Sequence, residues 1–157
     1  MEGTAAGFSA WLLRQVAEDT EITKAVALET AQRSLQRAVK GTNDAGAVDR
    51  GQFKRSWVAA RTLDGAELRN DAPYAGVIEY GRRPGKPGPP LTPILEWVER
   101  KLELPPGAAW VVAKTIRDRI HEKGTKPRFI LRKVVAKMGD DYHQAAVRTL
   151  RRRHGNG

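Results

Sequence analysis

The sequence has no cysteine, only three histidines and no long hydrophobic run. Without cysteine the chain forms neither a disulfide nor a thiolate site, which suits a reducing compartment. The histidines, His121, His143 and His154, are far apart and lack the spacing of metal ligands. No stretch approaches the ~18 apolar residues that span a membrane, and the N-terminus lacks the basic and apolar regions of a secretory signal. We therefore expect no membrane contact, no metal and no cofactor.

The familiar catalytic motifs are also missing. No G-x-S-x-G sequence marks a serine nucleophile. The stretch 81–86 is not a phosphate-binding loop, because three residues rather than four separate its glycines and Pro87 stands where serine or threonine would hold magnesium. Glu79, Glu96 and Glu99 lack a second buried acid at a defined separation, which favours salt bridges over acid–base catalysis. We expect no catalytic residue and no enzyme.

Positive charge, in contrast, is abundant and uneven. The net charge is +10, and residues 1–50 carry −1 while residues 51–157 carry +11. This excess favours acidic or phosphate-rich partners, although solubility alone also explains a charged surface. The densest basic stretch, residues 114–133, is a candidate face for DNA or for an acidic protein, without a helix-turn-helix, zinc-finger or aromatic RNA-binding sequence. Its candidate contacts are Lys114, Lys123, Lys126, Arg128 and Arg132.

A loop near residues 81–91 is crowded with proline and glycine. Four prolines and three glycines fill positions 81–90, which excludes a helix or a central strand there. Arg82, Arg83 and Lys86 make the loop cationic. A loop of this length in a compact domain indicates a function or a partner. We expect it to protrude and to capture a neighbouring subunit, because its prolines reduce the entropy lost on ordering.

The residue pattern predicts an α+β fold with helices packed around a small antiparallel sheet. Asp64-Gly65 predicts a two-residue hairpin turn between strands at residues 54–63 and 66–71. Residues 72–80 favour a short helix that starts with Pro73 and ends at Gly81.

Helical spacing of apolar residues accounts for most of the remaining chain. Gly41 is expected to end the helix over residues 20–40, and Thr92 is expected to cap the helix that follows the proline-rich loop. The other helices are expected over residues 8–17, 20–40, 108–122 and 128–152, and Gly124-Thr125-Lys126-Pro127 is expected to break the chain between the last two. Together these elements predict one domain over residues 1–157, with an N-terminal helix, a protruding loop and a basic C-terminal tail.

Three motifs in this order resemble a family of bacteriophage neck and tail-completion proteins. Gly51-x-Phe53-Lys54-Arg55-Ser56-Trp57 resembles the G-x-L-x-x-S-W that opens the family's first strand. Asn70-x-Ala72-x-Tyr74-Ala75-x-Val77-Ile78-Glu79-Tyr80-Gly81 is similar to its N-x-A-x-Y-A-x-x-x-E-x-G signature. Gly124-Thr125-Lys126-Pro127-Arg128-Phe129-Ile130-Leu131-Arg132 is similar to its G-T-x-P-x-x-F-(L)-R element. The resemblance spans about residues 20–140, and it departs at Phe53, where a smaller aliphatic is usual, and at Lys133, where proline is common.

The resemblance implies a virion structural protein of the phage head–tail junction, not an enzyme, assembled in the bacterial host cytoplasm. It implies a ring or ring-bound subunit that contacts its own copies and neighbouring connector, head-closure or tail-tube proteins around the DNA channel. The candidate subunit-interface residues are Arg82, Arg83, Lys86, Trp57, Tyr74 and Glu79. The alternative is a non-specific nucleic-acid-binding protein that uses residues 114–133 and the C-terminal arginines.

Overall fold

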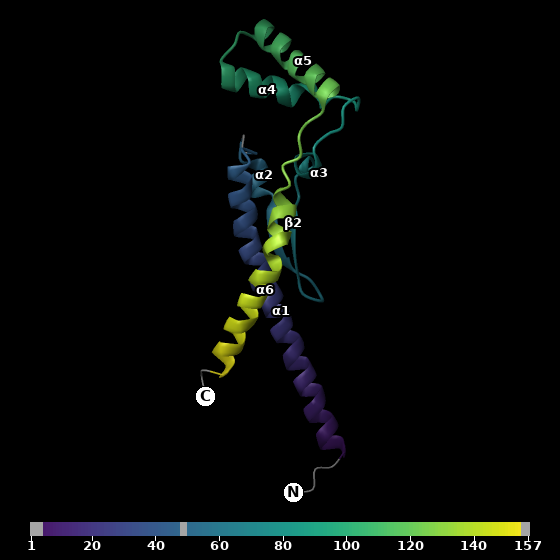
Figure 1. Cartoon of the computed structure of the whole chain (residues 1–157), viewed down its shortest axis with the longest axis vertical. Coiled ribbons are helices and arrows are strands. Elements are labelled where there is room, and N and C mark those ends of the chain that lie inside the picture. The colour runs from purple at the N-terminus through teal and green to yellow at the C-terminus, as the bar shows by residue number, and fades with distance from the viewer. Residues whose placement is uncertain (1–4, 48–49, 155–157) are drawn as a thin grey trace. The chain divides into compact units, whose positions relative to one another are not determined.

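The computed structural model describes the backbone of residues 5–47 and 50–154, and the side chains of residues 17–47 and 50–153 (Figure 1). The chain divides into two compact units, one formed by Met1–Pro73 with Ile130–Gly157 and the other by Tyr74–Phe129. Helices predominate over a single two-stranded antiparallel sheet in the described residues, which confirms the predicted α+β class. That the chain is one domain stays a prediction.

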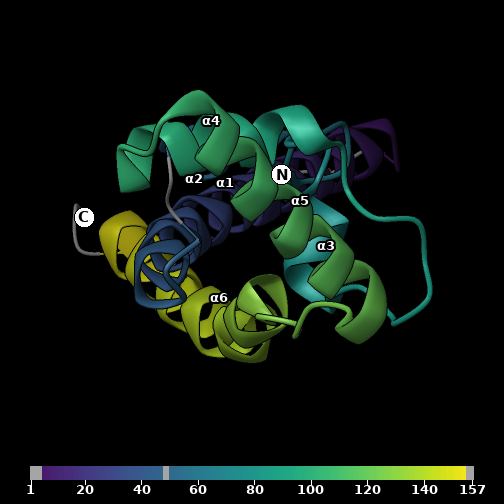
Figure 2. The same ribbon diagram turned by 90° about the horizontal axis from the view of Figure 1, so that it is seen from above.

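The first unit is built around the long helix α1 (Ala5–Asp44). Helix α6 (Ile130–His154) runs antiparallel to α1 and packs against its C-terminal part, while the two helices diverge towards the N-terminus of α1 (Figure 1). Figure 2 shows the same pair from above. The sheet and the short helix α2 (Gln52–Arg55) also contact α1. Small side chains allow this close approach, because Ala31, Ser34 and Ala38 are buried along one stripe of α1.

The predicted break between helices at 8–17 and 20–40 is wrong, because α1 is continuous. No proline lies within it, so residues 18–21 continue the helix instead of capping a new one. The predicted stop at Gly41 is also wrong. The helix continues to Asp44, and Gly41 lies where α1 packs on α6, since a Cβ there would be at an ordinary contact distance of 3.4 Å from Cγ2 of Ile130.

The hairpin pairs β1 (Trp57–Arg61) with β2 (Ala66–Asn70) in antiparallel register, from Trp57 opposite Asn70 to Arg61 opposite Ala66. The connection is a four-residue loop, closed by a 3.0 Å hydrogen bond from Thr62 N–H to Gly65 O. The predicted two-residue turn is therefore wrong, and the first strand begins later than predicted because residues 52–55 are helical. Phe53 packs edge-to-face on Trp57, with ring centroids 5.8 Å apart.

The second unit contains α3 (Ala75–Tyr80), α4 (Leu91–Leu102) and α5 (Pro106–Lys123). Helices α4 and α5 pack against each other around the fully buried Val98, Ala109 and Ala113. Helix α4 begins at Leu91 after Pro90, so the predicted cap at Thr92 is wrong, and Pro73 lies outside α3. The predicted ends at Gly81 and Gly124 are confirmed.

Helix α6 carries an unexpected buried group. Ile130, Val134 and Ala145 are buried, whereas Tyr142 is exposed. Asp141, one residue earlier, is fully buried instead. Its carboxylate faces α1, where it meets a basic partner that the apolar pattern of α6 does not reveal.

Candidate partner-binding surfaces

Asn70 connects the first two motifs of the family resemblance. Its side-chain amide donates a 2.9 Å hydrogen bond to Phe53 O and its Oδ1 accepts one of 3.0 Å from Ala72 N–H. Beside it, Asp71 N–H donates to Ser56 O at 2.9 Å. Asparagine suits this position because its side chain bonds both to its own neighbouring backbone and to a distant carbonyl.

The second and third motifs meet at the end of α3. The last-turn carbonyls of α3 have no partner within so short a helix, and the returning segment supplies donors. Arg128 N–H donates to Ile78 O at 3.0 Å, and Phe129 N–H donates to Glu79 O at 3.2 Å. This joint therefore links segments that lie about fifty residues apart in the sequence.

An isolated antiparallel bridge between Arg82 and Thr125 closes this joint. The two backbones exchange hydrogen bonds of 3.1 and 2.9 Å, and residues 83–124, with α4 and α5, form an excursion between them. Gly81 and Gly124, with φ of 71° and 68°, flank the bridge. A Cβ at Gly81 would overlap Thr125 O, and one at Gly124 would overlap Arg82 O, so both positions require glycine.

An open hollow of about 450 Å³ lies over the joint. Val77 and Ile78 supply apolar lining from α3, and the segment 125–128 supplies the opposite side. Val77 is 40% exposed and Tyr80, on the same short helix, is 70% exposed. Exposed apolar side chains next to a hollow are typical of a protein-contact surface.

The proline-rich loop is anchored on its own unit. Gly85 N–H donates to His121 O at 2.8 Å, and His121 Nδ1 donates to Lys86 O at the same distance. Arg82 Nη1 also donates to Pro87 O at 2.7 Å. The loop is thus held to the C-terminal half of α5, while the side chains of Arg83 and Lys86 remain exposed and without an ion pair in the described part of the chain.

The other predicted interface residues differ in accessibility. Trp57 is buried, and its indole Nε1 donates a 2.9 Å hydrogen bond to Thr42 Oγ1, so its role is in the core of the first unit. Glu79 is also buried. Both side chains are thus packed inside the chain, and their place in a subunit interface stays a prediction. Tyr74 is 37% exposed and stays a candidate.

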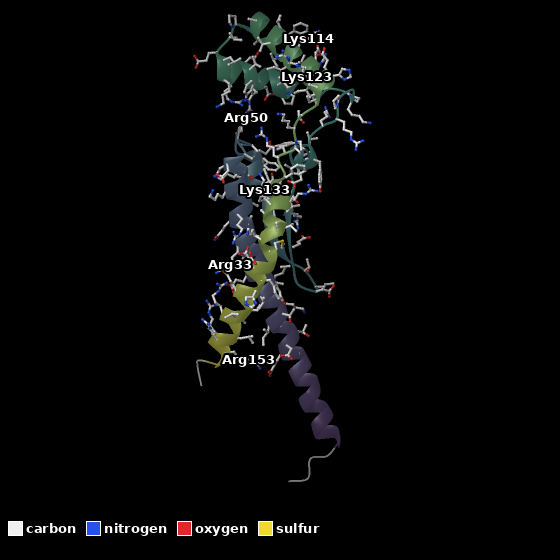
Figure 3. The ribbon with its side chains drawn as sticks, viewed as in Figure 1. Arg33, Arg50, Lys114, Lys123, Lys133 and Arg153 are labelled. Carbon is white, nitrogen blue, oxygen red and sulfur yellow. The ribbon has the colours of Figure 1, made fainter. Side chains whose placement is uncertain are left out.

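The basic stretch 114–133 does not form one face. Lys114 and Lys123, labelled in Figure 3, are nine residues apart on α5, which places them on opposite sides of a helix with 3.6 residues per turn. Lys114 also pairs with Asp118 at 2.9 Å and holds the pKa of that carboxyl below its ordinary value. Lys126 and Arg128 lie in the segment after α5, whereas Arg132 belongs to α6 in the other unit.

The polar contacts between α1 and α6 form an antiparallel series that sequence reasoning missed. Among them, Arg37 grips the buried Asp141 with two hydrogen bonds of 2.9 and 2.7 Å, and this hydrogen bonding is the main cause that raises the pKa of Arg37. Arg153, near the C-terminal end of α6 (Figure 3), donates a hydrogen bond to Glu18 of α1. This arginine of the C-terminal cluster therefore contributes to the packing of α6 against α1. The pairs are Glu18 with Arg153, Glu29 with Arg148, Arg33 with Gln144, and Arg37 with Asp141.

No protein-family model, curated protein or solved structure matches this chain. Within residues 5–47 and 50–154, no helix combines the length and the apolar character that crossing a bilayer requires. In the same described residues, no three His, Cys, Asp or Glu side chains are grouped so as to hold a metal ion. Any proposal for the function therefore depends on the geometry of the three motifs and on the exposed surfaces around them.

Proposed function

We propose that this chain is a structural subunit of a phage head–tail junction, a neck or tail-completion component that assembles as a ring or ring-bound subunit. The observation that supports this most is the use of the three motifs as joints. Asn70 acts through side-chain hydrogen bonds to the backbone, and Gly81 and Gly124 act through close backbone packing. Residues of this kind fix the path of the backbone, which suits a subunit that acts by fitting against other subunits.

The exposed surface near the joint supports the same proposal. Val77 lines the hollow, and Tyr80 on the same short helix is largely exposed. Arg83 and Lys86 present positive charge on the anchored loop. Interfaces are rich in aromatic side chains and arginine. The proposed neighbours are copies of this chain and connector, head-closure or tail-tube proteins, with the virion as its location.

The test uses a phage whose genome encodes this chain, with a stop codon introduced at Gln52. We expect DNA-filled heads and separate tails to accumulate, and the purified chain to restore joined, infectious particles. As a matched comparison, Y80S should restore poorly, while L63S, which also removes an exposed apolar side chain but on the hairpin loop, should restore normally. Intact, infectious particles in the stop-codon phage would refute the proposal.

The second candidate is non-specific nucleic-acid binding. It is favoured by Lys123 and Lys126, which are exposed and make no ion pair within the described residues. Phosphate contacts make affinity fall steeply with salt. Fluorescence anisotropy with a duplex DNA at moderate salt tests it directly. Tight binding by the purified chain, weakened by K123A/K126A, would favour this candidate over the head–tail role.

A further inference from the structure

The first unit has a groove between the C-terminal half of α1 and the N-terminal half of α6. Its volume is about 300 Å³, and a second hollow of about 470 Å³ continues from it, with Arg37 and Lys40 lining both. The floor of the groove is apolar and its rim is basic. Gly41, Ala45, Ile130 and Val134 form the floor, and Lys40, Lys133 and Lys137 form the rim.

Two of the rim lysines have no role in holding the fold. Lys133, labelled on α6 in Figure 3, and Lys137 are exposed and make no hydrogen bond or ion pair in the described part of the chain. They lie four residues apart on one helix face, where like charges repel each other. Lys40, across the groove, pairs with Asp44 at 2.6 Å. The fold therefore carries an uncompensated pair of cations on α6 at the edge of an apolar floor.

The composition of the groove distinguishes an acidic protein segment from a nucleic acid. A phosphate backbone brings charge but nothing that gains from an apolar floor. In contrast, two carboxylates one helical turn apart match the spacing of Lys133 and Lys137, and an aliphatic side chain can pack between the lysine methylene stems.

We propose that this groove binds an acidic segment of a protein partner. The segment presents two carboxylates one helical turn apart to Lys133 and Lys137, and inserts an aliphatic side chain over Ile130 and Val134. The proposal is independent of the head–tail role, because it rests only on the groove of the first unit.

The probe is a fluorescein-labelled helical peptide of about 18 residues, long enough to hold a helix, with a central Glu-Ala-Ala-Leu-Glu sequence. We expect K133A/K137A in the full chain to weaken its binding about tenfold, which corresponds to about 1.4 kcal/mol. The matched control is R61A/K101A, which removes the same charge from two exposed side chains outside the groove and should change affinity less than twofold. Replacing the peptide leucine by serine should also weaken binding.

Charge reversal guards against a misfolded variant. K133E/K137E should lose the acidic peptide and gain a peptide with Lys in place of both Glu residues, with helical circular dichroism retained. Equal losses in K133A/K137A and R61A/K101A would overturn the proposal, because they would indicate general attraction. Tighter binding of a duplex DNA than of the peptide at the same salt, also lost in K133A/K137A, would overturn it in favour of phosphate.

Discussion

The buried carboxylate of Asp141 makes a sharp prediction about stability. Its side chain is 0% exposed, and its partner Arg37 is 47% exposed. Removing one partner of a buried pair leaves an uncompensated charge and costs about 3–5 kcal/mol. Because water reaches the Arg37 side of the pair, we expect R37M to cost about 3 kcal/mol, at the lower end of that range. D141N should cost less, about 1–2 kcal/mol, because the half-exposed guanidinium can turn to solvent.

A double-mutant cycle separates this pair from general effects of substitution. We expect R37M/D141N to cost about 2 kcal/mol, well below the sum of the single changes, because the unpaired charge is gone. Urea denaturation at neutral pH, followed by circular dichroism, gives each free energy of unfolding. K40M is the control, since the Lys40–Asp44 pair is exposed on both sides and should contribute less than about 1 kcal/mol. If R37M is as mild as K40M, or if the two single changes add, the reasoning is wrong.

Three further predictions concern single positions. G81A should destabilise the protein by more than ~2 kcal/mol, because its Cβ would overlap a backbone carbonyl. G85A, where φ is similar but the space is open, should cost about 1 kcal/mol, and thermal unfolding of the two variants measures the difference in stability. T42V should cost about 1–3 kcal/mol in denaturant unfolding, because a buried indole N–H loses its acceptor. The pKa of the Asp118 carboxyl in the folded protein should lie below its ordinary value of 3.8. Its contribution to the stability of the fold is therefore present above pH 3.8 and is lost as the pH falls through the pKa of the folded state. In an NMR titration of the carboxyl groups, K114M should raise this pKa toward 3.8.

The main helices were predictable, but their ends were less so. Periodic apolar residues predicted helical structure through most of α1, α5 and α6. Gly41 gave a false stop, because α1 packs on Ile130 of α6 at this position and continues to Asp44. The hairpin was predicted, yet its turn was misjudged because the pairing register, which decides loop length, depends on both strands together.

The candidate site was predictable only as separate motifs. Sequence identified Gly81 as a helix end and Arg82 as part of a loop, but not the bridge from Arg82 to Thr125. It also took residues 114–133 as one basic face, although α5 turns Lys114 and Lys123 to opposite sides. His121 anchors the loop through hydrogen bonds to the loop backbone, and these cannot be deduced from the amino-acid composition.

The sequence by itself determined the helix-rich class, the hairpin, the breaks at Gly81 and Gly124, and the excess of positive charge. The helices, the hairpin and the breaks depend on local backbone preference and short-range periodicity, which each segment has independently of the rest of the chain. The charge depends on composition alone. Only the tertiary structure decided which charges have partners. Arg37 and Asp141 are 104 residues apart in the chain and form a buried pair, whereas Lys133 and Lys137 remain without one in the described residues, because pairing depends on the packing of α1 against α6.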